Sequence, residues 1–242
     1  MPGPRILASA ANDLYAALKQ AYAECTSREG AAVKADMKKL DHYRAKAGQF
    51  RILEVPATAY LMVDGAGDPT TSTEFRDGVG ALYPTAYTVK FACKARGEDF
   101  VVGPLEALWW ADDYSVFTDR LDRNAWQWTL MIAQPDWVTE QDAQEARDHV
   151  RAKKDAPAAL DRVRWEILDE GLCVQTLHIG PYNEEGPILE RMHREFLPAE
   201  GLTLRGRHHE IYLSDPDRTA PERLRTLLRQ PVSREHQPPP MH

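Results

Sequence analysis

Two stretches of the sequence follow the same course, AYLMVDGAGDPTTSTEFRDGVGALY at residues 59–83 and CVQTLHIGPYNEEGPILERMHREFL at residues 173–197. Each begins as an apolar run typical of a strand, breaks at glycine and proline, and continues with apolar residues at helical spacing. Strand-like segments follow, FVVGPLEALWW at residues 100–110 and RGRHHEIYLSDP at residues 205–216. This repeat predicts a strand-helix-strand-strand unit that occurs twice.

One such unit leaves a face of its sheet uncovered, so two units are expected to pair around a common core. We therefore predict an α+β fold, a duplicated strand-helix-strand-strand arrangement with a pseudo-two-fold antiparallel sheet and a ligand groove between the halves. The predicted organisation is a helical extension at residues 1–35, a single domain at residues 36–232 with repeats at about 50–138 and 165–232, and a disordered tail at residues 233–242.

Several further elements are predicted from local patterns. Thr139 is placed to cap a helix that begins at Glu140, and a second helical stretch is predicted from Pro157 to Asp169. A last short helix is expected after Thr219, where a threonine is followed three residues later by glutamate. Near the start of the chain, apolar spacing predicts a helix over residues 12–25.

Composition limits the classes of function. The formal net charge is −7, and an acidic surface disfavours general binding to nucleic acid. No apolar run approaches the roughly 20 residues that a membrane span needs. The three cysteines are far apart, which favours a reduced, cytoplasmic protein without disulfides.

Glu210 is the main candidate for chemistry. Because side chains alternate along a strand, Glu210 and Tyr212 share one face, while His209 and Ile211 share the other. A carboxylate beside a phenol in an aromatic cavity could activate water or balance a cationic ligand. The alternative is a solvated glutamate on an exposed strand, since most charged strand residues are exposed.

Glu106 occupies the corresponding place in the first repeat, and both glutamates are expected to face the groove. Trp109 and Trp110 follow it and point to opposite sides of the sheet, so that one indole could stack on a flat ligand. Simple core packing would explain the same tryptophans.

The histidines suggest no metal centre. His208 and His209 are adjacent and point to opposite sides of a strand, and the spacing His-Glu-x-x-His is absent. The sequence also lacks a dinucleotide fingerprint, a Walker loop and a Gly-x-Ser-x-Gly elbow. We therefore expect neither a metal nor a cofactor.

Long phrases of the sequence resemble stand-alone GyrI-like small-molecule-binding proteins. The phrases are KKLDHYRAK, LMVDGAGDP, FRDGVGALYPTAYTVKF, DFVVGPLEALWW, WQWTLMIAQPDWVT, HIGPYNEEGPILERMH and GRHHEIYLSDPDRTAPERLRTLLRQPV. The resemblance implies the duplicated fold of the SHS2 type and a ligand-engaging glutamate at Glu210. It also implies a cytoplasmic monomer or homodimer whose partner is an aromatic small molecule, with no direct contact to nucleic acid or membrane.

Some members of this family open the strained cyclopropane of DNA-alkylating antibiotics of the yatakemycin and duocarmycin type. By this resemblance Glu210 is expected to orient or deprotonate water, with Tyr182 or Tyr212 assisting. The expected ligand contacts are Glu106, Trp109, Trp110, Trp137, Tyr87 and His178.

Two other functions stay open from the sequence. The first is a protein that binds and sequesters aromatic drugs without turnover. The second is an inhibitor of DNA gyrase, which needs an exposed surface for a protein partner more than a polar groove. A sensor fused to a DNA reader is not expected, because about 35 residues before the matched region are too few for a helix-turn-helix module and its linker.

Overall fold

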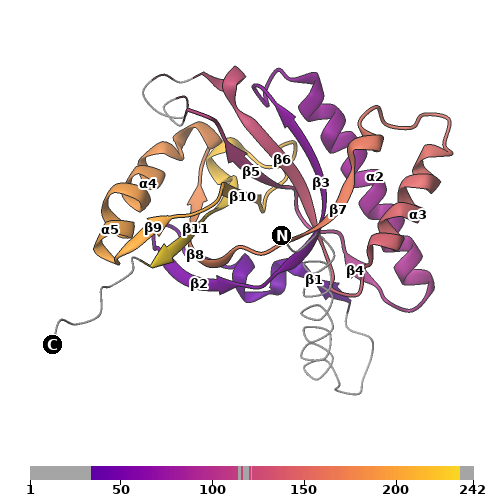
Figure 1. Ribbon diagram of the computed structural model, residues 1–242, viewed down its shortest axis with the longest axis horizontal. Helices are drawn as coiled ribbons and strands as arrows, with labels where there is room; N and C mark the ends of the chain where they lie inside the picture. Colours follow the sequence, from indigo (N-terminus) through magenta and orange to yellow (C-terminus); the bar gives the residue numbers. More distant parts are fainter. Residues whose placement is uncertain (1–33, 114–115, 117–119, 121, 235–242) are drawn as a thin grey trace, which may run out of the picture. The chain divides into compact units, whose positions relative to one another are not determined.

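The computed structural model describes residues 34–113, 116, 120 and 122–234 (Figure 1). Most of them form one antiparallel sheet with helices packed on it. Its strands are β2 (Arg51–Val55), β3 (Thr58–Ala66), β5 (Glu106–Trp110), β6 (Gln127–Gln134), β7 (Arg164–Leu168), β8 (Gly171–Ile179), β9 (Leu202–Leu204), β10 (His208–Tyr212) and β11 (Arg225–Arg234). Two short strands, β1 (Ala35–Asp36) and β4 (Phe100–Val101), pair separately and in parallel. The predicted α+β class is confirmed.

The strand order is β2-β8-β11-β10-β5-β6-β3-β7, and β9 pairs with β11. From either end, the order begins with an edge strand, β2 or β7. Three strands of one half follow, and the last of these three is one of the central pair, β10 or β5. The edge strands are exchanged between the halves, because β2 pairs with β8 and β7 pairs with β3. Two repeated halves would produce this order, although the duplication itself stays a prediction.

Helices and single turns connect the strands. They are η1 (Met37–Lys39), η2 (Asp41–Tyr43), α2 (Thr73–Ala95), η4 (Arg123–Ala125), α3 (Glu140–Arg151), η5 (Leu160–Arg162), η6 (Tyr182–Glu184), α4 (Gly186–Arg191), the π-helical turn η7 (Met192–Phe196), α5 (Leu197–Ala199) and η8 (Pro221–Arg223). The predicted cap of α3 is confirmed, since Thr139 and Asp142 form a reciprocal capping box. No described helix is both long and apolar enough to cross a bilayer.

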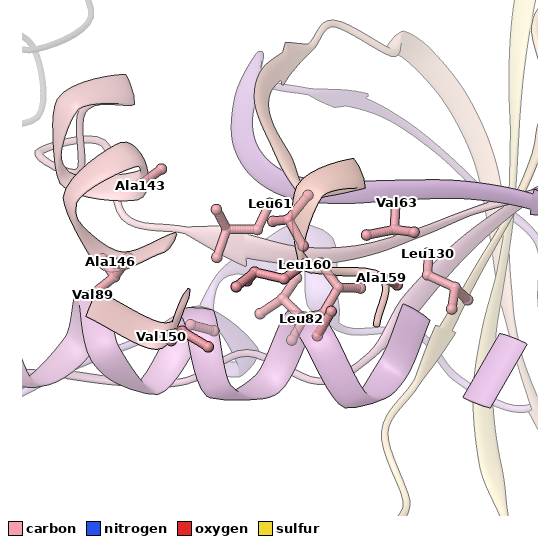
Figure 2. Close-up of a cluster of buried hydrophobic side chains, with 14 of the residues drawn as sticks. Leu61, Val63, Leu82, Val89, Leu130, Ala143, Ala146, Val150, Ala159 and Leu160 are labelled. Atoms are coloured by element: carbon pink, nitrogen blue, oxygen red, sulfur yellow. The ribbon is translucent and has the colours of Figure 1, made fainter. Parts of the chain in front are cut away.

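The largest core lies between the first half of the sheet and the helices α2 and α3 (Figure 2). Leu61 and Val63 of β3 face Leu82 and Val89 of α2, and all four side chains are inaccessible to solvent. Burying each of them contributes roughly 1.5–3 kcal/mol, so this cluster fixes the position of α2 on the sheet. A smaller cluster that includes Met192 and Val174 holds the second half's helices against β8.

Gly65 permits the close packing of this core. A Cβ atom at this position would lie 2.1 Å from the Cη2 atom of Trp128, closer than any real contact. Trp128 is fully buried and lies directly opposite Gly65 on β6. The glycine that marks the break in the first repeat is therefore required by the indole across from it.

Three predicted boundaries differ from the structure. The predicted helix from Pro157 to Asp169 is a single turn, η5, followed by β7, because this segment pairs with the edge of β3. The helix expected after Thr219 is one turn, and β11 takes up the following sequence through Arg234. The predicted tail therefore begins at least two residues later, since Ser233 and Arg234 pair with β9. The helix predicted over residues 12–25 lies outside the described residues.

Candidate functional site

The central strands β5 and β10 carry the two predicted glutamates on opposite faces of the sheet. Glu106 lies directly opposite Ile211, and Glu210 lies opposite Ala107. Opposed residues of an antiparallel pair share a face, and neighbours along a strand alternate. The expectation that both glutamates face one groove is therefore wrong. A shift of one residue along a strand exchanges its faces, so similar positions in two strand-like segments do not place two side chains on one face.

Glu210 is held by a chain of donors on its own face. The Tyr212 hydroxyl donates to Glu210 Oε2 at 2.7 Å, and the Trp109 indole N–H donates to the Tyr212 oxygen at 3.2 Å. The Glu210 side chain is 15% exposed. The predicted pairing of Glu210 with Tyr212 on one face is confirmed, and Trp109, not Trp110, is the indole beside them.

Glu185, which the sequence analysis did not select, is a second carboxyl at this place. It lies at the end of the turn η6, is 5% exposed, and is close enough to Glu210 for the charge of Glu210 and a hydrogen bond between the two carboxyls to act on it. Burial and the charge of Glu210 raise the pKa of Glu185 to about 10. Burial likewise raises the pKa of Glu210 to about 7, against the lowering effect of hydrogen bonds from Tyr212 and Trp109.

The two buried carboxyls therefore titrate as a pair, and both pKa values lie above the ordinary value of a glutamate. Two carboxyls with separated pKa values are the arrangement that lets one act as an acid and the other as a base.

The turn that carries Tyr182 closes over this carboxyl pair. Its ring meets the Tyr212 ring edge-on at 5.5 Å between centroids, and Tyr182 is 39% exposed. His178 Nε2 lies 3.1 Å from the carbonyl oxygen of Pro181 and anchors the turn. Gly180 enters it with a φ of 142°, a conformation that glycine adopts without strain. His178 therefore supports the site through the turn.

Aromatic rings form the wall on the side of the first half. Trp109 stacks on Phe75 with an interplanar angle of 16° and meets Trp126 edge-on at 5.7 Å between centroids. Aromatic rings that stack on one another beside a nearly neutral carboxyl pair suit a flat, apolar ligand.

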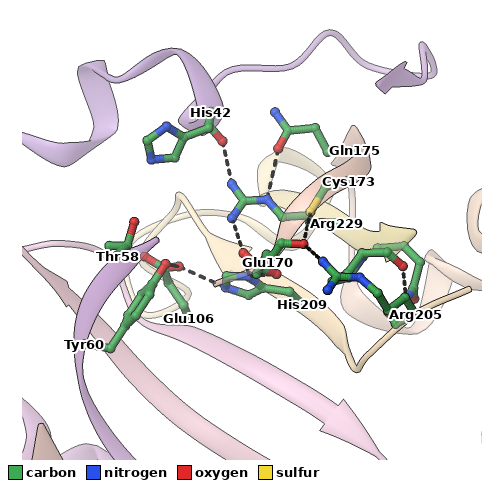
Figure 3. Close-up of polar contacts among 12 residues, drawn as sticks. His42, Thr58, Tyr60, Glu106, Glu170, Cys173, Gln175, Arg205, His209 and Arg229 are labelled. Atoms are coloured by element: carbon green, nitrogen blue, oxygen red, sulfur yellow. Dashed lines mark hydrogen bonds and ion pairs between the residues drawn. The ribbon is translucent and has the colours of Figure 1, made fainter. Parts of the chain in front are cut away.

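Glu106 belongs to a different cluster, which is fully buried on the other face (Figure 3). Tyr43 donates to Glu106 Oε1 at 2.6 Å, and His209 Nε2 lies 2.9 Å from Glu106 Oε2. His209 Nδ1 lies 3.0 Å from Glu170, which also accepts from Arg229 at 2.8 Å. Each charge here meets an opposite charge or a donor.

This buried cluster also fastens the segment before β2. Arg229 donates to the backbone carbonyl of His42 at 2.6 Å, and Gln175 donates to that of Arg44 at 2.9 Å. Burial would raise the pKa of Glu170, but His209 and Arg229 lower it to about 2. Glu170 is therefore ionised at neutral pH and anchors this segment, and the structure places Glu106 in the same cluster.

Three other predicted contacts lie apart from the carboxyl pair. Trp110 is stacked under Arg207, 3.5 Å from its guanidinium carbon, and lines a hollow of about 450 Å³ on the Glu106 face. Trp137 meets Phe100 edge-on beside β4. Tyr87 is 47% exposed on α2, where its ring lies beside Tyr83.

Titratable side chains in the described part of the chain do not gather into a metal site. Within it, no group of three or more His, Cys, Asp and Glu residues is arranged to hold an ion.

A family model for the GyrI-like small molecule binding domain matches residues 48–233. The chain belongs to this family. An uncharacterized conserved protein from Listeria innocua is 40% identical, with a TM-score of 0.75, over 83% of this chain and 100% of that one. Two further Listeria innocua structures, each described as a hydrolase, are 39% and 40% identical, with TM-scores of 0.70 and 0.72 and the same coverage. No curated protein matches the sequence.

The range that matches the GyrI-like domain contains every residue of the carboxyl site. It runs from before β2 to the penultimate residue of β11, and so includes Glu185 and Glu210. The identity to the Listeria proteins extends across both halves, since those chains are covered completely.

Proposed function

We propose that this GyrI-like protein is a hydrolase that opens strained, electrophilic rings in flat aromatic compounds, with cyclopropanes of the duocarmycin type as substrates. The carboxyl pair of Glu185 and Glu210 carries the proposal, because it provides an acid and a base side by side in a buried place. The similarity to two Listeria proteins described as hydrolases supports the reaction class.

In the proposed reaction, Glu210 is the general base. Ionised Glu210 takes a proton from a water molecule, whose oxygen forms a bond to the methylene carbon of the cyclopropane. The ring C–C bond breaks, and its electron pair moves into the conjugated dienone, which becomes aromatic. The strain of the ring and this gain of aromaticity supply much of the driving force, so positioning and proton transfer suffice for catalysis.

Glu185 is the general acid of this proposal. As the dienone becomes aromatic, negative charge develops on its carbonyl oxygen. Glu185 remains protonated at neutral pH and gives its proton to this oxygen. Glu185 has then lost one proton and Glu210 has gained one, so transfer between the two carboxyls restores the starting state.

Tyr212 and Tyr182 have different parts in this proposal. Tyr212 donates to Glu210 at 2.7 Å and holds the base in one orientation. Tyr182 lies at the exposed side and covers the ligand with its ring. Trp109 and Phe75 supply the apolar wall for the flat part of the substrate.

The test measures the mass of the product formed from a duocarmycin-type compound. The wild-type protein should add one water, and Glu210→Gln or Glu185→Gln should lower kcat by about 10²–10⁴. Glu184→Gln is the matched control, because Glu184 is an exposed neighbour in the same turn and should leave kcat unchanged.

A binder without turnover is the second candidate, favoured by the aromatic wall around a buried carboxyl. A carboxylate enclosed by rings also suits a flat, apolar cation. Tight binding of the duocarmycin-type compound with no heavier product would reject the hydrolase and leave this function.

A further inference from the structure

Two hollows adjoin on the face of the sheet that carries Glu106. Their volumes are about 450 and 270 Å³, and both are lined by Arg164, Glu166 and Arg207. The larger one lies within the range of about 300–1,000 Å³ that is typical of small-molecule sites. The proposed hydrolase does not use this region, because Glu210 points to the opposite face of the sheet.

Apolar side chains line the smaller hollow. Leu108 and Trp110 follow Glu106 at steps of two along β5, so the three side chains share a face. Thr129 lies directly opposite Leu108 on β6. Besides Leu108, the apolar side chains in the lining of the smaller hollow are Met62, Leu168 and Pro231. The smaller hollow therefore offers a surface on which a flat ring can pack.

Most charged groups around the two hollows are compensated within the protein. Arg164 pairs with Asp64 at 2.8 Å and with Glu166 at 2.7 Å. Glu170 pairs with Arg229 at 2.8 Å, and both side chains are buried. These three carboxylates therefore already have cationic partners.

The turn between β9 and β10 adds two arginines without such a partner. Among the described residues, neither Arg205 nor Arg207 forms an ion pair with a carboxylate. Arg205 donates to the backbone carbonyl of Glu170, and Arg207 stacks on the ring of Trp110. The remaining charged side chain in the lining is Asp169, which is exposed. Two arginines against one aspartate leave an excess of one positive charge.

Stacking on Trp110 holds Arg207 ready for an anion. The guanidinium carbon lies 3.5 Å from the centre of the indole ring, and the indole N–H donates to Gln127 at 3.0 Å. Gln127 lies directly opposite Trp110 on β6, so the ring is fixed to the sheet. A stacked guanidinium keeps its N–H donors at its edge, where they match the two oxygens of a carboxylate. Because the ring restrains the arginine, less conformational entropy is lost when a ligand binds.

We propose that the two hollows bind a small aromatic carboxylate. Arg207 donates to its carboxylate, and Arg205 attracts it from the same turn. Its ring packs against Leu108 and the other apolar side chains of the lining. A monoanion matches the single excess charge, whereas the second charge of a phosphate would be opposed by Asp169. This site does not depend on the proposed function, because the sheet separates it from Glu210.

Calorimetry with two probes of the same shape tests the charge requirement. The wild-type protein should bind indole-3-acetate at least tenfold more tightly than indole-3-acetamide, because only the acetate forms an ion pair with Arg207. Arg207→Met keeps an apolar stem on Trp110 and should abolish this difference. Arg151→Met is the matched control, because it removes the same charge from an exposed position on α3 and should preserve the difference.

Proton–nitrogen NMR of the indole groups shows on which face of the sheet the probe binds. The resonances of Trp110 and Trp109 are assigned by their absence in Trp110→Phe and Trp109→Phe. The indole N–H resonance of Trp110 should move when indole-3-acetate is added. The resonance of Trp109, whose indole donates to Tyr212 at the carboxyl site, should stay in place.

Equal affinity of the wild-type protein for the two probes, or no binding of indole-3-acetate, would overturn the proposal. Full retention of the difference in Arg207→Met would overturn it as well. Movement of the Trp109 resonance in place of the Trp110 resonance would also do so, because the probe would then occupy the carboxyl site. None of these results depends on ring opening, so this proposal and the proposed hydrolase fail separately.

Discussion

The two faces of the strand pair β5 and β10 carry buried carboxyls in contrasting states. On one face, Glu106 and Glu170 meet His209, Arg229 and a tyrosine hydroxyl, and the charges are compensated inside the protein. On the other face, Glu210 lies beside Glu185, a group of the same sign. The first arrangement fastens the fold. The second places two buried carboxyls next to each other, an arrangement that is typical of reactive sites.

Removing the central cation of the first face should have the largest effect on stability. Arg229→Met leaves the Glu170 carboxylate without its arginine partner and should lower the free energy of unfolding by about 3–5 kcal/mol. Urea denaturation measures the loss. Arg207→Met is the control, because Arg207 stacks on Trp110 at the surface and should cost less than about 1 kcal/mol. Equal losses would contradict the anchoring role.

The tyrosines on the two faces should respond differently to loss of their hydroxyls. Tyr43→Phe removes a 2.6 Å donor from Glu106 and should lower the free energy of unfolding by about 1–3 kcal/mol. Tyr212→Phe should cost less than about 1 kcal/mol at pH 6, because Glu210 can take up a proton instead. Thermal unfolding at pH 6 compares them, and a larger loss for Tyr212→Phe would contradict the contrast.

The pH dependence of stability should have opposite signs on the two faces. The folded-state pKa values of Glu185 and Glu210 are raised to about 10 and about 7, so the native protein binds more protons there and their stabilisation is lost as pH rises above about 4.5. Glu170 has a pKa lowered to about 2, so its contribution is lost as pH falls below about 4.5.

Urea titrations from pH 5 to pH 9 test the sign on the reactive face. Glu210→Gln should become more stable than the wild type as pH rises from 5 to 8, by up to about 1–3 kcal/mol. Glu184→Gln, at an exposed neighbour of Glu185, should follow the wild type at every pH. A constant difference between Glu210→Gln and the wild type would show that Glu210 is ionised throughout.

The smallest expected effect separates the two tyrosines of the site. Tyr212→Phe should lower kcat for the duocarmycin-type compound by about tenfold or more, because it frees the base from its fixed orientation. Tyr182→Phe keeps the covering ring and should change kcat by less than about threefold, since Tyr182 donates to neither carboxyl among the described contacts. The reverse order would make Tyr182 the assisting tyrosine.

Alternation along a strand made part of this site predictable. The shared face of Glu210 and Tyr212 and the opposite directions of Trp109 and Trp110 follow from a period of two. The relation between Glu106 and Glu210 was not predictable from their similar positions. It depends on the register of β5 against β10, and an error of one residue exchanges the faces.

Glu185 could not be predicted as a site residue from the sequence alone. It follows Glu184 in a turn before glycine and proline, a context typical of solvated carboxyls. Its burial comes from the packing of this turn over β10 and β11, which are distant in the sequence. The strand β7 was missed for a related reason, because its pairing with β3 outweighs its helix-like local sequence.

The central claim is that Glu185 and Glu210 share a face on which carboxyls hold protons at neutral pH, whereas Glu170 is ionised on the other. Carbon-13 NMR of protein labelled at the glutamate side-chain carboxyl carbons measures this directly. We predict one resonance that titrates near pH 7 and is absent in Glu210→Gln, and a second that titrates near pH 10 and is absent in Glu185→Gln. Titration of both carboxyls between pH 4 and pH 5 would contradict the account.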